Sequence, residues 1–296
     1  MRDPRAPEAI GAVLHRRLGA LVADLRVRDG ETRDGVPDGL HQARVTSRRL
    51  RSALATFRPA LDREVTEPIR VDLRWLALSL GAARDAEVVH ARLRRLIPES
   101  AVARARVDRV LDPMTRSAGE QVDSALTADR YRTLQVSLDR LVAHPPWTKA
   151  AGKPAEQVLP RRLRREQRRL DRRADRAAEV RDQPGAYDDA VHDVRKAAKR
   201  LRYAWEVAEP VLGGEAERQR TAARELTRLL GERQDITLTV ALLPIIEAGA
   251  AADGEATEPW EGLRREEVVR ADHIAAETLD MLKSGTLSAG VAVREK

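Results

Sequence analysis

The segment HQARVTSRRLRSALATFRP, residues 41–59, occurs a second time as HDVRKAAKRLRYAWEVAEP, residues 192–210, at an offset of 151 residues. The histidine, the basic pair, the Leu-Arg step and the closing proline recur in register. A second anchor, LGAARD at residues 80–85, recurs as LGERQD at residues 230–235, at an offset of 150. Because two anchors keep nearly the same offset, we interpret the chain as an internally duplicated unit.

The fold class follows from the spacing of apolar residues. Both copies of the segment have helical periodicity, and Ala, Leu, Arg and Glu, which favour helices, dominate the chain. Strand patterns are almost absent, which predicts an all-α fold of about ten helices. Short connections between long amphipathic helices favour antiparallel packing. We therefore predict two antiparallel helical bundles related by a pseudo-twofold axis, with a basic groove or cavity between them.

The boundary between the two copies is predicted at AHPPWTKAAGKPAEQ, residues 143–157, where Pro and Gly interrupt the helical pattern. We assign residues 1–143 to the first bundle, residues 144–157 to a linker and residues 158–296 to the second bundle.

The repeated segment is expected to begin a helix in each copy. Asp38 is the predicted cap of the helix at His41, and Asp188 or Asp189 of the helix at His192. Further helix boundaries are expected at Pro59, Pro68, Pro98 and Pro113.

Composition narrows the classes of function. The 54 Lys and Arg residues exceed the 47 Asp and Glu residues by 7, and most of the basic residues are Arg. The absence of Cys excludes disulfides and thiolate metal sites and fits a reducing compartment. No apolar run approaches the roughly 20 residues of a membrane span, and the N-terminal segment is amphipathic and unlike a signal peptide. We therefore expect a cytoplasmic protein without membrane contact.

The repeated helix carries a basic stripe. On a helical wheel, four positions of each copy fall within about 80° of one another, opposite an apolar face. Like charges at i and i+4 repel, at a cost of a few tenths of a kcal/mol per pair, unless an anion lies along them. The alternatives are a solvated basic face or pairing with acids of neighbouring helices. The four positions are His41, Arg44, Arg48 and Arg51 in the first copy and His192, Arg195, Lys199 and Arg202 in the second.

Other basic residues extend these stripes. Arg49, Arg200 and Lys196 flank them. At the offset of 150, Arg70 and Arg74 of the first copy correspond in sequence to Arg220 and Arg224 of the second. The run PRRLRREQRRLDRRADR, residues 160–176, contains nine Arg but also three acids, and we interpret it mostly as a solvated face.

The expected ligand is a linear polyanion. Arg presents a planar fork to phosphate oxygens, and Lys presents a point charge. Cations one helical turn apart, about 5.4 Å, match a polymer of regular charge. His gains its proton readily beside a polyanion and then donates from both ring nitrogens.

The motifs HQARVTSRRLRSAL and HDVRKAAKRLRYAWE, each followed by LGxxxD, resemble the CHAD family, the conserved histidine α-helical domain. The resemblance implies two helical bundles around a basic central cavity, polyphosphate binding and an association with polyphosphate granules. It places the family's basic motif on His41, Arg44, Arg48, Arg49 and Arg51, and on His192, Arg195, Lys199, Arg200 and Arg202. Tyr203 matches as well and is expected to pack or orient. Some members also carry a CYTH tripolyphosphatase domain, whose β-barrel and ExExK motif we do not find, so hydrolysis by that route is not expected.

We therefore expect non-catalytic binding of inorganic polyphosphate, with no metal, cofactor or catalytic residue. Cations beside His41 and His192 would repel a divalent metal, and no nucleophile or phosphate-loop motif occurs. Asp85 and Asp235 of the LGxxxD motif are expected to cap helices or pair with Arg. The alternatives are a nucleic-acid binder and a helical scaffold for acidic protein partners. The first lacks a recognition module and aromatic stacking residues, so we expect nucleic acid only as a non-specific competitor.

Overall fold

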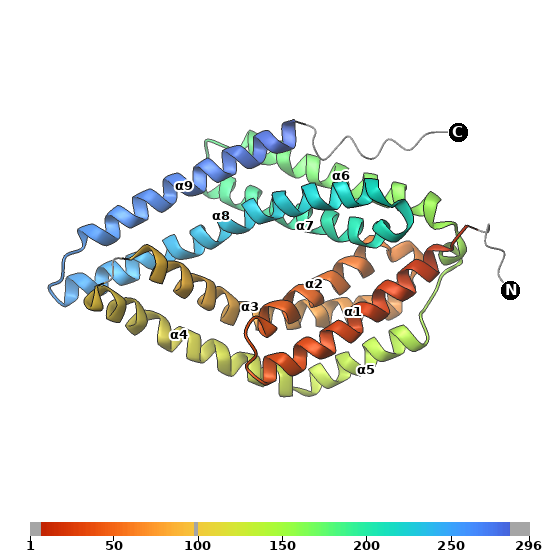
Figure 1. Cartoon of the computed structure of the whole chain (residues 1–296), viewed down its shortest axis with the longest axis horizontal. Coiled ribbons are helices and arrows are strands. Elements are labelled where there is room, and N and C mark those ends of the chain that lie inside the picture. The colour runs from red at the N-terminus through yellow and green to blue at the C-terminus, as the bar shows by residue number, and fades with distance from the viewer. Residues whose placement is uncertain (1–6, 98–99, 285–296) are drawn as a thin grey trace.

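A computed structural model describes residues 7–97 and 100–284 of the chain. Within these residues the chain forms nine α-helices, two short 3-10 helices and no β-strand, which confirms the predicted all-α fold class. Figure 1 shows an elongated molecule in which helices of the N-terminal half lie along one long side and those of the C-terminal half along the other.

The helices alternate with short connections. The first half contains α1 (Ile10–Arg33), α2 (Gly39–Thr56), the 3-10 helix η1 (Arg58–Ala60), α3 (Arg63–Leu96), α4 (Ala101–Thr127) and α5 (Asp129–Ala143). The second half contains the 3-10 helix η2 (Lys149–Gly152), α6 (Ala155–Glu179), α7 (Pro184–Leu212), α8 (Gly214–Ala252) and α9 (Glu258–Lys283).

The two halves pack their helices in the same order. In the first half α1 packs on α2, α2 on α3 and α3 on α4, and in the second half α6, α7, α8 and α9 follow the same sequence of neighbours. The offset of 151 places α2 at residues 190–207, within α7, and the offset of 150 places α3 at residues 213–246, along α8. The residues that would correspond to α5, 279–293, lie mostly outside the described residues. This order is the one expected of a duplicated helical unit.

Two apolar clusters join the halves at opposite ends of the molecule (Figure 1). At one end, Ile10, Leu14 and Phe57 from the first half pack among core residues of α6 to α9. At the other end, Leu93 of α3 packs with Leu243 of α8, within a cluster that also includes residues of α4 and α9. We call these the two end clusters. They leave α2 and α3 facing α7 and α8 in the middle of the molecule.

One of the two helix starts is predicted at the right residue, but neither predicted side-chain cap forms. Asp38 does occupy the N-cap position of α2, but its φ of 67° is left-handed, so its side chain caps no backbone N–H and instead accepts from Gln42 Nε2 at 2.7 Å. Side-chain capping requires an extended N-cap residue. Helix α7 begins at Pro184, a residue type favoured in the first helical turn, so Asp188 and Asp189 lie inside the helix and His192 lies two turns in.

Two prolines expected at helix boundaries lie within helices. Pro68 is in α3 and Pro113 is in α4. Each removes one backbone hydrogen bond, which the tertiary packing of such long helices offsets. Pro59 lies in η1, between α2 and α3 as expected, and Pro98 lies outside the described residues.

Helix α8 contains one 18-residue window with a mean hydropathy of 1.5, enough by length and composition to cross a membrane. The window departs from the expectation that no apolar run approaches the length of a membrane span. Of this window, 28% is buried inside the structure, and Leu243 and Ile246 of α8 are fully buried.

Candidate anion-binding cavity

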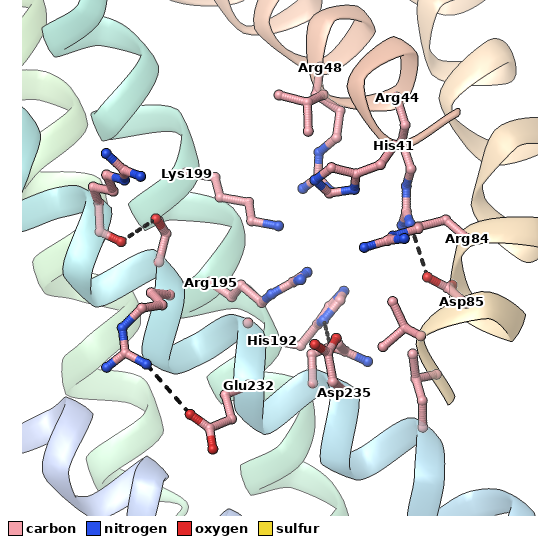
Figure 2. Close-up of a pocket in the computed structure, with 18 of the residues that line it drawn as sticks. His41, Arg44, Arg48, Arg84, Asp85, His192, Arg195, Lys199, Glu232 and Asp235 are labelled. Atoms are coloured by element: carbon pink, nitrogen blue, oxygen red, sulfur yellow. Dashed lines mark hydrogen bonds and ion pairs between the residues drawn. The ribbon is translucent and has the colours of Figure 1, made fainter. Parts of the chain in front are cut away.

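An open cavity of about 1230 Å³, which we call the central cavity, lies where α2 and α3 face α7 and α8 (Figure 2). Its lining is dominated by positive charge, with eleven basic residues, two histidines and four carboxylates. The basic residues are Arg44, Arg48, Arg84, Arg92, Arg95, Arg195, Lys199, Arg202, Arg224, Arg228 and Arg270, and the carboxylates are Asp85, Glu225, Glu232 and Asp235. The excess of cations makes the central cavity suited to an anion.

Eight of the fifteen basic residues predicted as ligands line the central cavity. They are His41, Arg44, Arg48, His192, Arg195, Lys199, Arg202 and Arg224. Their side chains reach the cavity because the basic stripe of each repeated helix lies opposite its core residues: Leu50 of α2 and Leu201 of α7 are fully buried.

The other seven predicted ligands lie outside the central cavity, and five of them are held by carboxylates. These pairs join Arg49 to Glu206 at 3.2 Å, Lys196 to Asp193 at 3.0 Å, Arg200 to Glu166 at 2.7 Å, Arg220 to Glu209 at 2.8 Å, and Arg70 to Glu67. Arg51 and Arg74 have no ion pair within the described part of the chain, and burial, followed by the charges of Arg48 and Arg74, lowers the pKa of Arg51.

Five arginines of the lining were missed by the sequence reading: Arg84, Arg92, Arg95, Arg228 and Arg270. Three of them had a detectable signal, because Arg84, Arg92 and Arg95 lie at helical spacing along one face of α3. Arg270 had none, since it reaches the cavity from α9, outside both repeated motifs.

Within the described part of the chain, five basic residues of the lining form no ion pair with a carboxylate: Arg48, Arg95, Arg195, Lys199 and Arg224. Burial lowers the pKa of three of them, Arg48, Arg195 and Lys199. Figure 2 shows these side chains pointing toward one another from α2 and α7. Other lining arginines are neutralised: Arg44 pairs with Asp85 at 2.9 Å, Arg92 with Glu267 at 2.6 Å and Arg270 with Glu232 at 2.7 Å.

The uncompensated cations repel one another. Burial lowers the pKa of Lys199 well below its ordinary value, and the charges of Arg195, Arg48, Arg44 and Arg202 lower it further. Burial, followed by the charge of Arg48, lowers the pKa of Arg195 to about 10. Because a lowered pKa in a basic group marks an unfavourable site for positive charge, the empty cavity carries an electrostatic cost that an anion would relieve.

The two histidines of the central cavity, His41 and His192, lie beside the same positive charges. Burial lowers the pKa of His41 from its ordinary value, and the charge of Arg84 adds to this effect. Burial also lowers the pKa of His192, although the hydrogen bond between His192 Nδ1 and Gln234 Oε1, at 2.9 Å, acts in the opposite direction. The buried Nδ1 of His41 has no hydrogen-bond partner among the described residues. Both rings are therefore mainly neutral near pH 7 in the free protein.

The acids of the LGxxxD motifs differ in role. Asp85 forms the expected ion pair, with Arg44, whereas Asp235 forms none within the described residues. Burial raises the pKa of Asp235, and the charge of Arg195 opposes this rise. Neither residue caps a helix, because both lie inside α3 and α8.

One group of side chains outside the central cavity has metal-ligand character. His90, Asp108 and Asp112 place ligand atoms within 4.8 Å of one another. However, Arg94 donates to both carboxylate oxygens of Asp108 at 2.9 Å. An arginine therefore already occupies the position that a cation would take.

Comparison with known proteins identifies the family and the fold. The model of the CHAD domain family matches residues 16–244. Two uncharacterized proteins of Mycobacterium tuberculosis, from strains CDC 1551 and H37Rv, are each 31% identical over 241 residues, covering 78% of this chain and 45% of their own. The chain thus spans less than half the length of these relatives.

Two solved structures share the fold. The crystal structure of the CHAD domain from the plant Ricinus communis superimposes with a TM-score of 0.73 at 23% identity, covering 96% of this chain and 93% of that one. PptA from Streptomyces chartreusis superimposes with a TM-score of 0.72 at 18% identity, covering 94% of this chain and all of that one.

Proposed function

The chain belongs to the CHAD domain family, and on that premise we propose that it binds inorganic polyphosphate in the central cavity without hydrolysing it. The observation that carries the proposal is the group formed by Arg48, Arg195 and Lys199, which face one another without a carboxylate partner among the described residues. Positive charges held together at such a cost favour an anion of high charge density. Two basic stripes with one-turn spacing favour a linear anion over a compact one.

The carboxylates of the central cavity support binding without catalysis. Phosphoryl transfer depends on metal ions that carboxylates or similar ligands hold in position. Here Asp85 is engaged by Arg44, Glu232 by Arg270 and Glu225 by Arg228 at 2.7 Å. Only Asp235 of the four lining carboxylates has no ion pair within the described residues, and three of the four charges that most affect its pKa are arginines.

A binding titration tests the proposal. We expect tight binding of long-chain polyphosphate and much weaker binding of orthophosphate, because several contacts made by one polymer reinforce one another. Duplex and single-stranded DNA should bind more weakly than polyphosphate. Equal or tighter binding of DNA would instead support the nucleic-acid alternative, and binding only to an acidic protein would support the scaffold alternative.

Matched variants locate the site. Arg48→Gln with Arg195→Gln should weaken long-chain polyphosphate binding at least about a hundredfold, since each of the two charge-assisted contacts contributes ~1.5–3 kcal/mol. The control, Arg164→Gln with Arg168→Gln, removes two charges from α6 residues that do not line the central cavity and should leave binding nearly unchanged. Equal effects of the two variants would place the binding elsewhere. Release of orthophosphate from the bound polymer, with Mg²⁺ present, would contradict the absence of hydrolysis.

The cellular location follows from the ligand. A chain that binds long polyphosphate is expected in the cytoplasm and on polyphosphate granules where these form. A fluorescent fusion of the wild-type chain should colocalise with granules, and the Arg48→Gln/Arg195→Gln variant should not.

A further inference from the structure

A second basic cavity, of about 450 Å³, lies between α6 and α7. We call it the α6 cavity. Five arginines and one acid line it: Arg165, Arg169, Arg172 and Arg173 from α6, Arg200 from α7, and Glu166. The predicted solvated basic run at residues 160–176 thus contributes four arginines to one site.

The arginines of the α6 cavity are poorly neutralised. Glu166 is buried and pairs with Arg200, and Arg173 pairs with Asp193 at 3.2 Å. No ion pair joins Arg165, Arg169 or Arg172 to a carboxylate within the described part of the chain. These three exposed arginines follow one another at i, i+4 and i+7, so they form a row along about 10 Å of helix. Like Arg48, Arg195 and Lys199 of the central cavity, these three arginines have no carboxylate partner of the kind that a solvated helix face normally provides.

Helix α7 is the wall that the two cavities share. Lys199 and Arg202 line the central cavity, and Arg200, between them in sequence, lines the α6 cavity. Burial lowers the pKa of Arg200, although its pairing with Glu166 opposes this and the charge of Arg169 from α6 adds to it. The two basic cavities therefore lie on the two sides of one helix, and Arg200 of that helix faces the row on α6.

We propose that a linear polyanion bound in the central cavity continues around α7, beside Arg200, and along the Arg165, Arg169 and Arg172 row of α6. This inference rests on the proposed function and adds to it a preference for chain length. A short polyphosphate is held by the central cavity alone. A long one gains the additional contacts on α6, and its binding is therefore tighter and more sensitive to salt.

The test compares Arg169→Gln/Arg172→Gln with Arg164→Gln/Arg168→Gln as a matched control. Both double variants remove two arginines from α6, and neither Arg164 nor Arg168 lines either cavity. Binding of long-chain polyphosphate and of tripolyphosphate is measured by titration calorimetry at several salt concentrations. Thermal unfolding of each variant without ligand confirms that the fold is intact.

We expect the Arg169→Gln/Arg172→Gln variant to lose about three- to tenfold in affinity for long-chain polyphosphate, as exposed charge pairs allow. The slope of log affinity against log salt should become shallower by about 1.4, because each lost phosphate contact changes it by ~0.7 for a single-stranded polyanion. Affinity for tripolyphosphate should stay unchanged, and the control should match the wild type for both ligands.

Two results would overturn the inference while leaving the proposed function in place. In the first, the Arg169→Gln/Arg172→Gln variant behaves like its control with the long chain. In the second, it loses affinity for tripolyphosphate and for the long chain by the same factor, which would make α6 a part of the primary site. If the wild-type chain binds no polyphosphate of either length, the proposed function fails and the inference fails with it.

Discussion

Replacing Arg195 by Met should make the ligand-free protein more stable and a weaker binder. Arg195 lies in the central cavity without a carboxylate partner among the described residues, and burial and the charge of Arg48 lower its pKa from its ordinary value to about 10. A fall of this size corresponds to about 3 kcal/mol of unfavourable interaction in the charged form. Solvent in the open cavity screens part of it, so we expect a gain of about 1–2 kcal/mol in the free energy of unfolding. Met retains most of the apolar stem, which limits the loss of packing.

A second arginine of the same cavity provides the control. Arg92 also lines the central cavity, but its Nε donates to Glu267 Oε2 at 2.6 Å, and both side chains are buried. Arg92→Met leaves Glu267 buried without its partner, and this should lower the free energy of unfolding by about 3–5 kcal/mol. Two Arg-to-Met changes in one cavity are thus expected to shift stability in opposite directions.

The assays are urea unfolding without ligand and titration with long-chain polyphosphate. The Arg195→Met variant should unfold at higher urea with an unchanged slope and bind at least about tenfold more weakly, since one charge-assisted contact is lost. If this variant unfolds at lower urea, Arg195 is held by a favourable interaction, and the argument from uncompensated charge is wrong.

Three further predictions concern salt, packing and pH. Affinity for long-chain polyphosphate should fall linearly on a log–log plot against salt, and a flat response in calorimetry would contradict charge-driven binding. Leu50→Ala should lower the free energy of unfolding, measured with urea, by about 2–5 kcal/mol, because Leu50 is fully buried. The folded variant should bind polyphosphate normally, and a loss of affinity in fully folded protein would place Leu50 in the site. In the folded protein the pKa values of His41 and His192 are lowered, whereas an imidazole of the unfolded chain has a pKa of ~6.5. Near this pH the unfolded chain therefore binds more protons, so the stability of the ligand-free protein should rise as the pH rises to about 6.5 and above. Polyphosphate binding should take up protons and tighten from about pH 8 to 6. His41→Gln/His192→Gln should reduce the pH dependence of stability, measured by thermal unfolding, and the proton uptake on binding, measured by calorimetry in buffers of different ionisation enthalpy. Unchanged proton uptake would assign the protons to other groups.

Helical periodicity predicted the part of the site that lies on the repeated helices. The spacing of Arg44, Arg48, Arg195 and Lys199 places them on the face opposite the core residues, and the structure brings all four to one cavity. These positions were predictable because the phase of a helix is set by its own apolar residues.

Contacts between helices were not predictable in the same way. Arg49 was expected to bind ligand, but it pairs with Glu206 of α7, from the other half of the chain. Arg92 contributes to the cavity although its partner, Glu267, lies 175 residues away. Such pairings depend on how helices cross, and no local pattern encodes this. The start of α7 was missed for a local reason. The helix was expected to begin at Asp188 or Asp189, but it begins one turn earlier, at Pro184.

The two end clusters have a consequence for how the protein unfolds. Each contains side chains from both halves, so neither half can separate from the other without exposing Phe57 at one end and Leu93 at the other. The two repeated units should therefore lose their structure in a single cooperative transition, in contrast to repeat arrays whose units melt one after another. A cut in the chain between α5 and α6 should leave the two fragments associated, because the packing that unites them does not depend on the peptide connection.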